Sequence, residues 1–136
     1  MKTFTFPKPE HLCLRRDIDS LFASGARSTA AYPLRAVYRR LTDEETAGIP
    51  ATAPRVKVLL SVPKRKLRHA VDRNRAKRQL REAYRLQKHL LLSQLPQGVA
   101  LHIGFLWLSA APVPTELVAR KVKALLLRIG EDLRHP

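Results

Sequence analysis

Basic side chains recur at helical spacing between residues 73 and 85. This stretch holds six cationic side chains but only one acid, Glu82. When the residues are placed on a helix at about 100° each, the apolar side chains fall on one arc and the cationic ones on the adjoining arc. A guanidinium group can hold two phosphate oxygens, so an arginine-rich row favours a polyphosphate partner. The candidate binding residues in this row are Arg73, Asn74, Arg75, Lys77, Arg78, Arg81 and Arg85.

The sign pattern of this row differs from that of an ordinary solvated helix face. Such faces alternate acids and bases at i,i+4 spacing, whereas Arg73, Lys77 and Arg81 repel one another at that spacing. The spacing of like charges therefore indicates that a binding partner offsets their repulsion. Helices that lie on anionic membranes or bind calmodulin usually carry bulky apolar residues opposite their charges. The arc here holds Ala76 and Ala83, which suit close packing on a sheet better than insertion into lipid.

The overall composition agrees with an anionic partner. The 136-residue chain has 26 Lys and Arg against 11 Asp and Glu, for a formal charge of +15, and residues 64–88 carry a net +9 of it. Cys13 is the only cysteine, so neither an internal disulfide nor a cysteine-based zinc cluster can form. The N-terminus lacks the apolar run of a signal peptide, and the longest apolar stretch, 99–111, is too short to span a bilayer. We therefore expect a cytoplasmic protein.

No arrangement of nucleophile, acid or metal ligands is evident in the sequence. The five histidines share no metal-ligand spacing such as H-E-x-x-H, and neither a G-x-x-x-x-G-K-[ST] loop nor a G-x-S-x-G turn occurs. His102 lies in an apolar stretch, where a hydrogen-bonded core histidine or a sheet-face contact is more common than a metal ligand. If the protein takes part in catalysis, we expect the chemistry to belong to the molecule that it binds.

Hydrophobic periodicity predicts the element order α-β-β-α-β-α, which favours a small α+β sandwich. We expect a mixed sheet of three to four strands with three helices. Residues 1–10 are expected to be irregular, and the acidic, Gly- and Pro-containing segment 42–54 is expected to be a mobile hairpin connection. Thr115 is a candidate N-cap of the last helix. The expected elements are a helix over 15–24, strands over 34–41 and 55–62, a helix over 70–93, a strand over 99–108 and a helix over 116–130.

Two joined segments resemble the signature of a known family. The strand that contains Val58 is followed by a basic turn at Lys64 and Arg65, and then by Arg73-Asn74-Arg75-Ala76-Lys77-Arg78-Gln79-Leu80-Arg81. This arrangement closely resembles the bacterial ribonuclease P protein subunit, whose hallmark is an R-N-R-x-K-R-x-x-R helix after a strand and a K-K or K-R turn. The segment from Leu14 to Gly25 looks like the family's first helix and its terminal glycine. The resemblance extends over nearly the whole chain.

The resemblance implies a fold and a role. It implies a left-handed β-α-β crossover, against the general right-handed preference. It also implies that the chain, as a single RNA-binding domain over residues 1–136, joins a large catalytic RNA in an endoribonuclease that removes the 5′ leader of precursor tRNA. Mg²⁺ ions held mainly by the RNA would assist the attack of water. No organic cofactor, membrane association or obligate protein partner is expected.

The resemblance also assigns residues to two surfaces. Lys64, Arg65 and the signature helix are implied to face the catalytic RNA. A cleft between the sheet and the first helix is implied to bind the single-stranded leader. Phe22 matches an aromatic platform of that cleft, on which a base can stack, although a Phe on an apolar helix stripe is as often a core residue.

Two departures from the family pattern bear on leader binding. Ile18 takes a position in the cleft that is usually Phe, and it can contact a base but cannot stack on it. Pro63 replaces the more usual serine before the basic pair. Arg35 and Tyr38, on the first long strand, are weaker candidates for the same cleft.

Two other classes of function remain open at this stage. A structural RNA-binding protein of the ribosomal type would also be strongly basic, although ribosomal proteins often carry their charge in disordered tails. A DNA-binding protein could place the 70–93 helix in a major groove. Groove readers need side chains aimed at base edges, whereas a surface of arginine and lysine favours backbone contacts. Neither alternative predicts an effect on precursor tRNA cleavage.

Overall fold

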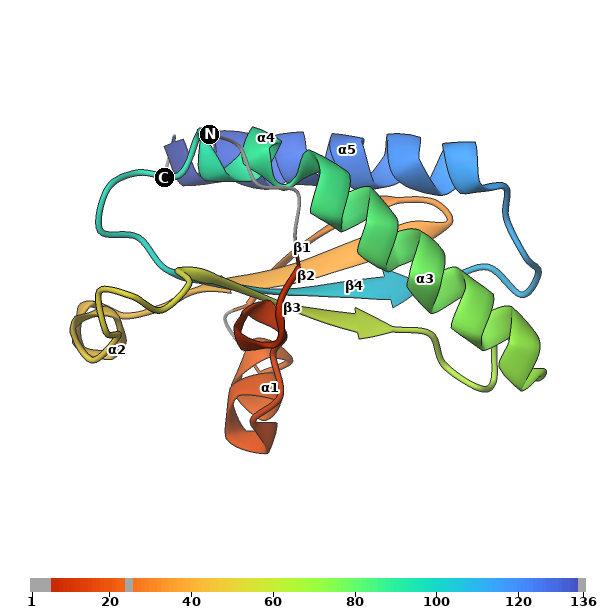
Figure 1. Cartoon of the computed structure of the whole chain (residues 1–136), viewed down its shortest axis with the longest axis horizontal. Coiled ribbons are helices and arrows are strands. Elements are labelled where there is room, and N and C mark those ends of the chain that lie inside the picture. The colour runs from red at the N-terminus through yellow and green to blue at the C-terminus, as the bar shows by residue number, and fades with distance from the viewer. Residues whose placement is uncertain (1–5, 24–25, 135–136) are drawn as a thin grey trace.

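A four-stranded sheet lies between a layer of helices on one face and a single short helix on the other (Figure 1). The computed structural model describes residues 6–23 and 26–134. The elements are a 3₁₀ helix (Lys8–Glu10), α1 (Arg15–Leu21), β1 (Arg27–Ala31), β2 (Leu34–Arg40), α2 (Asp43–Ala47), β3 (Val56–Ser61), α3 (Ala70–Gln87), α4 (His89–Leu92), β4 (Leu101–Trp107) and α5 (Thr115–Arg134).

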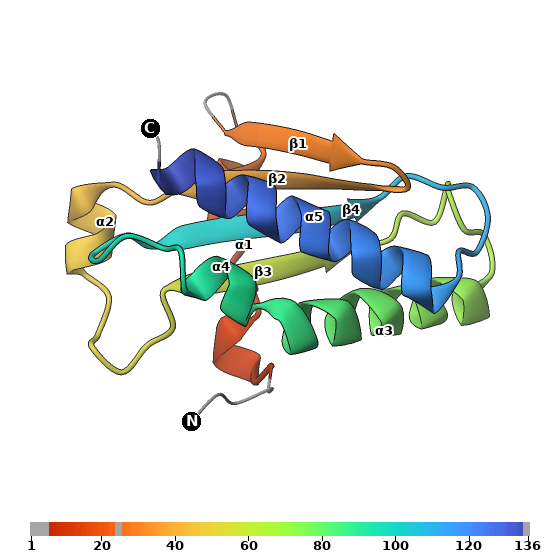
Figure 2. The same cartoon turned by 90° about the horizontal axis from the view of Figure 1, so that it is seen from above.

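The sheet has the strand order β1-β2-β4-β3. The pairs β1–β2 and β2–β4 are antiparallel, whereas β3 and β4 are parallel. Between these two parallel strands the chain passes through α3 and α4 on the helical side. In Figure 2, seen from that side, β3 runs to the right and β4 lies above it, so the crossover is left-handed. The handedness that the family resemblance implies is therefore present.

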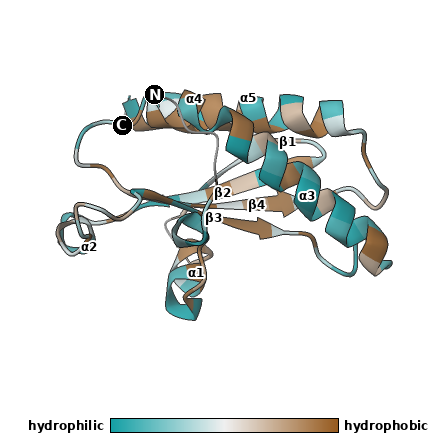
Figure 3. Ribbon diagram, in the orientation of Figure 1, coloured by the Kyte–Doolittle hydropathy of each residue, from teal (hydrophilic) through white to brown (hydrophobic). Residues whose placement is uncertain are grey.

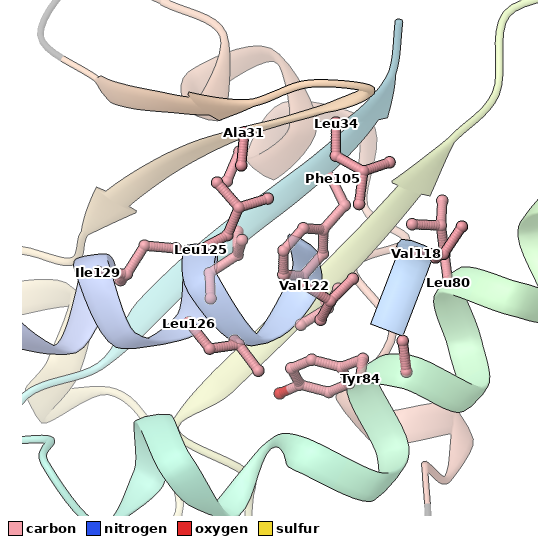
Figure 4. Packing of buried hydrophobic residues seen from close by; sticks show 14 of the residues in the cluster. Ala31, Leu34, Leu80, Tyr84, Phe105, Val118, Val122, Leu125, Leu126 and Ile129 are labelled. Carbon is pink, nitrogen blue, oxygen red and sulfur yellow. The ribbon is translucent and has the colours of Figure 1, made fainter. Parts of the chain in front are cut away.

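The main core lies between the sheet and the layer formed by α3 and α5 (Figure 4). Strand β4 is buried along almost its whole length, because it is a central strand with a helix on each side. The rings of Tyr84 in α3 and Phe105 in β4 lie 6.1 Å apart, and Val122 and Leu126 of α5 are fully buried beside them. Complete burial of each such side chain contributes about 1.5–3 kcal/mol, which makes this layer the main source of stability.

The opposite face of the sheet carries α1. Leu21 anchors this helix and is fully buried. Gly104 of β4 permits the close approach, because a Cβ atom there would lie 3.1 Å from Leu21 Cδ2 and 3.5 Å from the ring of Phe22. A side chain at position 104 would therefore press against Leu21 and the ring of Phe22, at the C-terminal end of α1.

The last helix is tied to the outer hairpin by a polar cluster. Asp132 of α5 accepts hydrogen bonds of 2.7 Å from the Arg27 guanidinium and one of 2.8 Å from the Tyr38 hydroxyl. The bond from Arg27, followed by that from Tyr38, lowers the pKa of Asp132. Burial, followed by the bond to Asp132, raises the pKa of Tyr38 to about 12. This cluster joins α5 to both β1 and β2.

The α+β fold and the order of the six main elements are confirmed. The additional strand β1 forms a hairpin with β2. Its sequence, Arg27-Ser28-Thr29-Ala30-Ala31, lacks apolar alternation because most of the strand is exposed, so the periodicity gave no sign of it. With β1 included, the sheet has four strands, which is the upper limit of the three to four that we expected.

Several boundaries differ from the expected ones. The segment 42–54 contains helix α2, which begins with a capping box between Thr42 and Glu45. The irregular start includes the 3₁₀ helix Lys8–Glu10. The first helix ends at Leu21, and Gly25 lies outside the described residues. Thr115 is the first residue of α5 and not its cap, since the amides of Leu117 and Val118 donate to the Pro114 carbonyl.

Candidate nucleic-acid interface

Helix α3 presents a cationic surface away from the core. Its buried side is formed by Ala76, Leu80, Ala83 and Tyr84, which pack into the main core. Figure 3 shows the resulting division, with hydrophilic residues along much of the outward side of α3. The predicted RNA-binding residues that are exposed on α3 or on the turn before it are Lys64, Arg65, Asn74, Arg75, Lys77, Arg78 and Arg81. We call this set the α3 surface.

The cations of the α3 surface have no acidic partner among the described residues. Ion pairs form at other side chains, and none of them involves a cation of this surface. The like-charge repulsion along the helix therefore persists in the free protein. An anionic ligand would relieve it, which makes this surface the strongest candidate for phosphate contacts.

The orientation of α3 is fixed by buried amides. The Gln79 side chain is buried and donates hydrogen bonds of 2.9 Å to the Val113 carbonyl and to Thr115 Oγ1, at the start of α5. About two helical turns further along the same side, Gln87 donates to the Ala119 carbonyl at 2.9 Å. These bonds hold α3 against α5, so the cationic row has one orientation relative to the sheet.

Arg73 has a different environment from its neighbours in the motif. Its side chain is half-buried and its Nη1 donates to the carbonyls of Leu67 and Arg68, at 2.9 and 2.8 Å. The loop that carries Lys64 and Arg65 is thus tied to the first turn of α3. Arg73 therefore arranges the α3 surface through this loop, whereas the sequence grouped it with the other candidate binding residues of the row.

The C-terminal part of the cationic row is paired within the protein. Arg85 donates to the Glu82 carboxylate at 2.6 and 2.9 Å, and the bond lowers the pKa of Glu82. Lys88, which follows the last residue of α3, is buried and forms a 2.7 Å ion pair with Glu10 of the N-terminal segment. The available positive charge is therefore concentrated in the first half of α3 and the turn before it.

A hollow of about 290 Å³ lies on the other face of the sheet, at the C-terminal end of α1. Phe22, with 47% of its surface exposed, lines it together with Arg35 of β2. Arg35 is exposed and donates to Ser28 Oγ at 3.0 Å. Ile18 is half-buried one turn earlier on α1 and does not line this hollow. We call this site the Phe22 hollow; two of the four predicted cleft residues meet there.

Tyr38 does not belong to the Phe22 hollow. Along β2 the side chains alternate between the two faces of the sheet, and Tyr38 is buried on the helical face, where it bonds to Asp132. The partial alternation in the sequence did not reveal which face each residue occupies. Tyr38 is therefore placed in the core and not in the cleft.

Sequence reasoning missed Lys57 on the α1 face, whereas it gave His102 as a core histidine or a sheet-face contact. Lys57 of β3 and His102 of β4 are paired in register and line a separate hollow beside Asp17 of α1. Lys57 alternates with the buried Val56 and Val58, and this alternation is the sequence signal that could have placed it on the face opposite the main core.

Within residues 6–23 and 26–134, no group of three or more His, Cys, Asp or Glu side chains is arranged to hold a metal ion. None of the helices in this part of the chain is both long and apolar enough to cross a membrane.

The fold and the two surfaces together define a small basic protein of the RNA-binding class, built as an α+β sandwich with a left-handed crossover. The family model for ribonuclease P matches residues 6–130, and the chain belongs to this family. It is 40% identical over 132 residues to the ribonuclease P protein component of Porphyromonas gingivalis, covering 96% of this chain and 90% of that protein. The component from Chlorobium phaeobacteroides is 36% identical over 91 residues, or 65% of this chain and 59% of that one.

Solved structures of this family share the fold. The RNase P protein from Thermotoga maritima superposes with a TM-score of 0.63 at 22% identity, over 88% of this chain and 96% of that one. The RNase P protein of Staphylococcus aureus gives a TM-score of 0.65 at 19% identity, over 88% of this chain and 94% of that one. At these identities the likeness concerns the fold alone.

Proposed function

We propose that the chain is the protein subunit of a ribonuclease P holoenzyme, an endoribonuclease in which an RNA subunit carries the chemistry. It binds the catalytic RNA and the 5′ leader of precursor tRNA, and it assists removal of the leader to form the mature 5′ end. The observation that carries this proposal is the unneutralised α3 surface, held rigidly by Gln79 and Gln87. A solvated helix face usually alternates acidic and basic side chains, whereas this surface is almost entirely basic.

The α3 surface faces the catalytic RNA. Its arginine forks suit phosphate oxygens and its position on a fixed helix suits a folded RNA of defined shape. Each phosphate that is neutralised releases counterions, so the affinity should fall steeply with salt. The Phe22 hollow, on the opposite face, receives the leader. There the exposed ring of Phe22 offers a stacking platform for a base, and Arg35 offers a charge to the backbone.

Mg²⁺ held mainly by the RNA supplies the hydrolytic chemistry in this proposal. The contribution of the protein is electrostatic, because cations on α3 reduce the repulsion between RNA phosphates and so lower the Mg²⁺ concentration that the assembly requires. We place the assembly in the cytoplasm, where precursor tRNA is made.

The decisive experiment measures cleavage of a precursor tRNA by the catalytic RNA of the same organism, at low Mg²⁺, with and without this protein. We expect the protein to raise the rate of correct 5′ maturation and to have no activity alone. The double variant R75E/R78E should lose this stimulation, while R120E/K123E, an equal change of charge at exposed positions of α5, should keep most of it.

Two results would count against the proposal. If tight, salt-sensitive RNA binding leaves cleavage unchanged, the protein is a structural RNA binder. If both charge reversals reduce the stimulation of cleavage equally, the stimulation depends on the net charge of the protein and not on the α3 surface.

A further inference from the structure

A hollow of about 550 Å³ lies on the helical side of the sheet, beside the edge strand β3. Tyr84 lines it from the C-terminal part of α3, Lys88 and Leu92 line it from the region of α4, and Glu10 lines it from the 3₁₀ helix. Residues 54–56, at the start of β3, complete the lining. The hollow shares no lining residue with the Phe22 hollow. We call it the Tyr84 hollow.

The hydroxyl of Tyr84 is the first sign of a ligand. Tyr84 is 1% exposed and its ring lies at the edge of the core cluster shown in Figure 4, yet its hydroxyl forms no hydrogen bond with any described residue. Burial, followed by the nearby carboxylate of Glu10, raises the pKa of Tyr84, so the hydroxyl stays protonated near neutral pH. Buried hydroxyls in native proteins are nearly always bonded. A polar atom of a molecule bound in the hollow would complete this bond.

A carboxylate oxygen beside this hydroxyl is also available. The Nζ atom of Lys88 lies 2.7 Å from Oε1 of Glu10, whereas Oε2 of Glu10 forms no hydrogen bond with a described residue. The inner part of the hollow therefore offers the Tyr84 hydroxyl as a donor and Oε2 as an acceptor. A phosphate or carboxylate group would be repelled by Glu10 at this place. The edge of a nucleobase fits it, because such edges combine N–H donors with ring or carbonyl acceptors.

The outer part of the hollow has the opposite charge. Arg55 lines it, is exposed, and takes part in no ion pair with a described residue. Its guanidinium can hold two oxygens of a phosphate. Pro54, Val56 and Leu92 supply apolar surface for a flat ring. A simple aromatic or fatty acid could pair with Arg55 but would leave the Tyr84 hydroxyl unbonded.

We propose that the Tyr84 hollow binds one nucleotide, with the base directed at Tyr84 and Glu10 and the phosphate at Arg55. The chemistry is that of a nucleoside 5′-phosphate, either free or as one unstacked unit of a bound RNA. The inference goes beyond the proposed function and does not depend on it, since it is tested first on the protein alone.

The first test is a titration of the full chain with each of the four nucleoside 5′-monophosphates. Binding is followed by NMR through the methyl groups of Val56 and Leu92, which report on the hollow itself. We expect at least one nucleotide to give saturable shifts, with a dissociation constant of about 1 mM or tighter. Inorganic phosphate, which detects anion binding on the basic surfaces, should leave these methyl groups unchanged.

Three variants assign the contacts. Tyr84→Phe should weaken binding about fivefold, as expected for one hydrogen bond, and should not lower stability, because the hydroxyl has no described protein partner. Arg55→Ala should weaken binding of the nucleotide about tenfold and leave binding of the corresponding nucleoside unchanged. Leu92→Trp, which reduces the space inside the hollow, should abolish binding. Leu86→Trp is its matched control, because Leu86 is similarly exposed and does not line the hollow.

A second measurement identifies the source of the nucleotide. Equilibrium dialysis with the radiolabelled nucleotide compares the free protein with its complex with the catalytic RNA, and the RNA alone serves as the blank. If a nucleotide of that RNA occupies the hollow, the RNA should abolish binding of the free nucleotide, and Tyr84→Phe should weaken RNA binding. If the ligand is a free nucleotide, the complex should bind it as tightly as the protein does.

Two results would overturn the inference. One is that none of the four nucleotides gives saturable shifts of the Val56 and Leu92 methyl groups. The other is that Leu92→Trp binds as tightly as Leu86→Trp. Neither result would affect the proposed function, which is tested by the stimulation of precursor tRNA cleavage.

Discussion

Arg73 and Arg75 are two residues apart, yet the structure gives them different roles. Arg73 is half-buried and bonds to two carbonyls of the preceding loop, whereas Arg75 is exposed. The motif therefore combines a residue that shapes the binding surface with one that is free to touch a ligand. Helical spacing puts the two residues about 200° apart but could not show that Arg73 is bonded to the loop, because the path of the loop relative to α3 is not contained in the periodicity.

For Arg75→Ala we expect weaker binding to the catalytic RNA with unchanged protein stability. An exposed phosphate contact contributes counterion release, so its loss should reduce the slope of log affinity against log salt by about one. Filter binding at several salt concentrations, with circular dichroism as a control for folding, measures both quantities. An unchanged slope would show that Arg75 touches no phosphate.

For Arg73→Ala we expect a loss of stability as well as of RNA affinity. Two hydrogen bonds from a partly exposed guanidinium contribute about 1 kcal/mol, and their loss should loosen the turn that holds Lys64 and Arg65. Urea unfolding of Arg73→Ala and Arg75→Ala side by side provides the comparison. Equal stability of the two variants would contradict the assigned role of Arg73.

At the scale of elements, the docking of α1 on the sheet depends on Gly104, which has no side chain. For Gly104→Val we expect a loss of about 1–3 kcal/mol through overpacking against Leu21. The displaced α1 should weaken leader binding while leaving contacts of α3 with the catalytic RNA unchanged. Gly48→Ala is the matched control, because its added Cβ would meet only ordinary contacts of 3.5 Å or more. Equal loss of both kinds of binding would contradict the separation of the two surfaces.

Helix α2 should make the stability of the protein depend on pH. The bond from Arg39, followed by that from the Thr42 amide, lowers the pKa of Glu45 to about 2, below its ordinary value of about 4.3. A lowered carboxyl pKa stabilises the fold above the unfolded-state pKa, and this contribution is lost as the pH falls through the folded-state value. Urea unfolding between pH 6 and pH 2 should show a smaller loss for Glu45→Gln than for the wild type. An equal loss of stability in the two proteins over this pH range would contradict the assigned role of Glu45.

The elements that the sequence predicted best are those with a strong apolar period. Helices α3 and α5 and strands β3 and β4 bury one face or both, and their periods reflect that burial. Strand β1 is held by pairing with β2 and has little core of its own, so its sequence lacks the signal. The burial of Lys88 could not be predicted, because its partner, Glu10, is 78 residues away and no local pattern reports such a contact.

At the scale of the molecule, both RNA-facing surfaces depend on one core. For Leu80→Asp we expect a loss of more than about 3 kcal/mol, because the substitution buries a carboxylate without a partner. Thermal unfolding followed by circular dichroism should show a strongly lowered midpoint, and both leader binding and RNA binding should fail together. A wild-type melting curve would mean that the helical phase of α3 is wrong.

Some properties of the whole molecule lie beyond sequence periodicity. The left-handed crossover came from the family resemblance, since general folding preferences favour the opposite hand. The hollow lined by Asp17, Lys57 and His102 brings together α1, the α2 segment and two strands. Its residues are scattered in the sequence and become neighbours only when the sheet forms, so no motif could have identified them.

The sheet lies between α3 and α1, and this fixes the spacing between the two proposed RNA-binding sites. The α3 surface and the Phe22 hollow are separated by one helix layer and one sheet, whose dimensions follow from backbone geometry and close packing and not from a hinge. In the proposed assembly the protein therefore holds the catalytic RNA and the leader at a fixed distance from each other. Inserting one residue into α3 ahead of Arg75 would turn every later residue by about 100° relative to the preceding turn, which carries Lys64 and Arg65. Because the core residues Ala76 and Leu80 turn with the later cations, the helix would have to repack on the sheet, and the α3 surface would shift without the loss of a single contact residue.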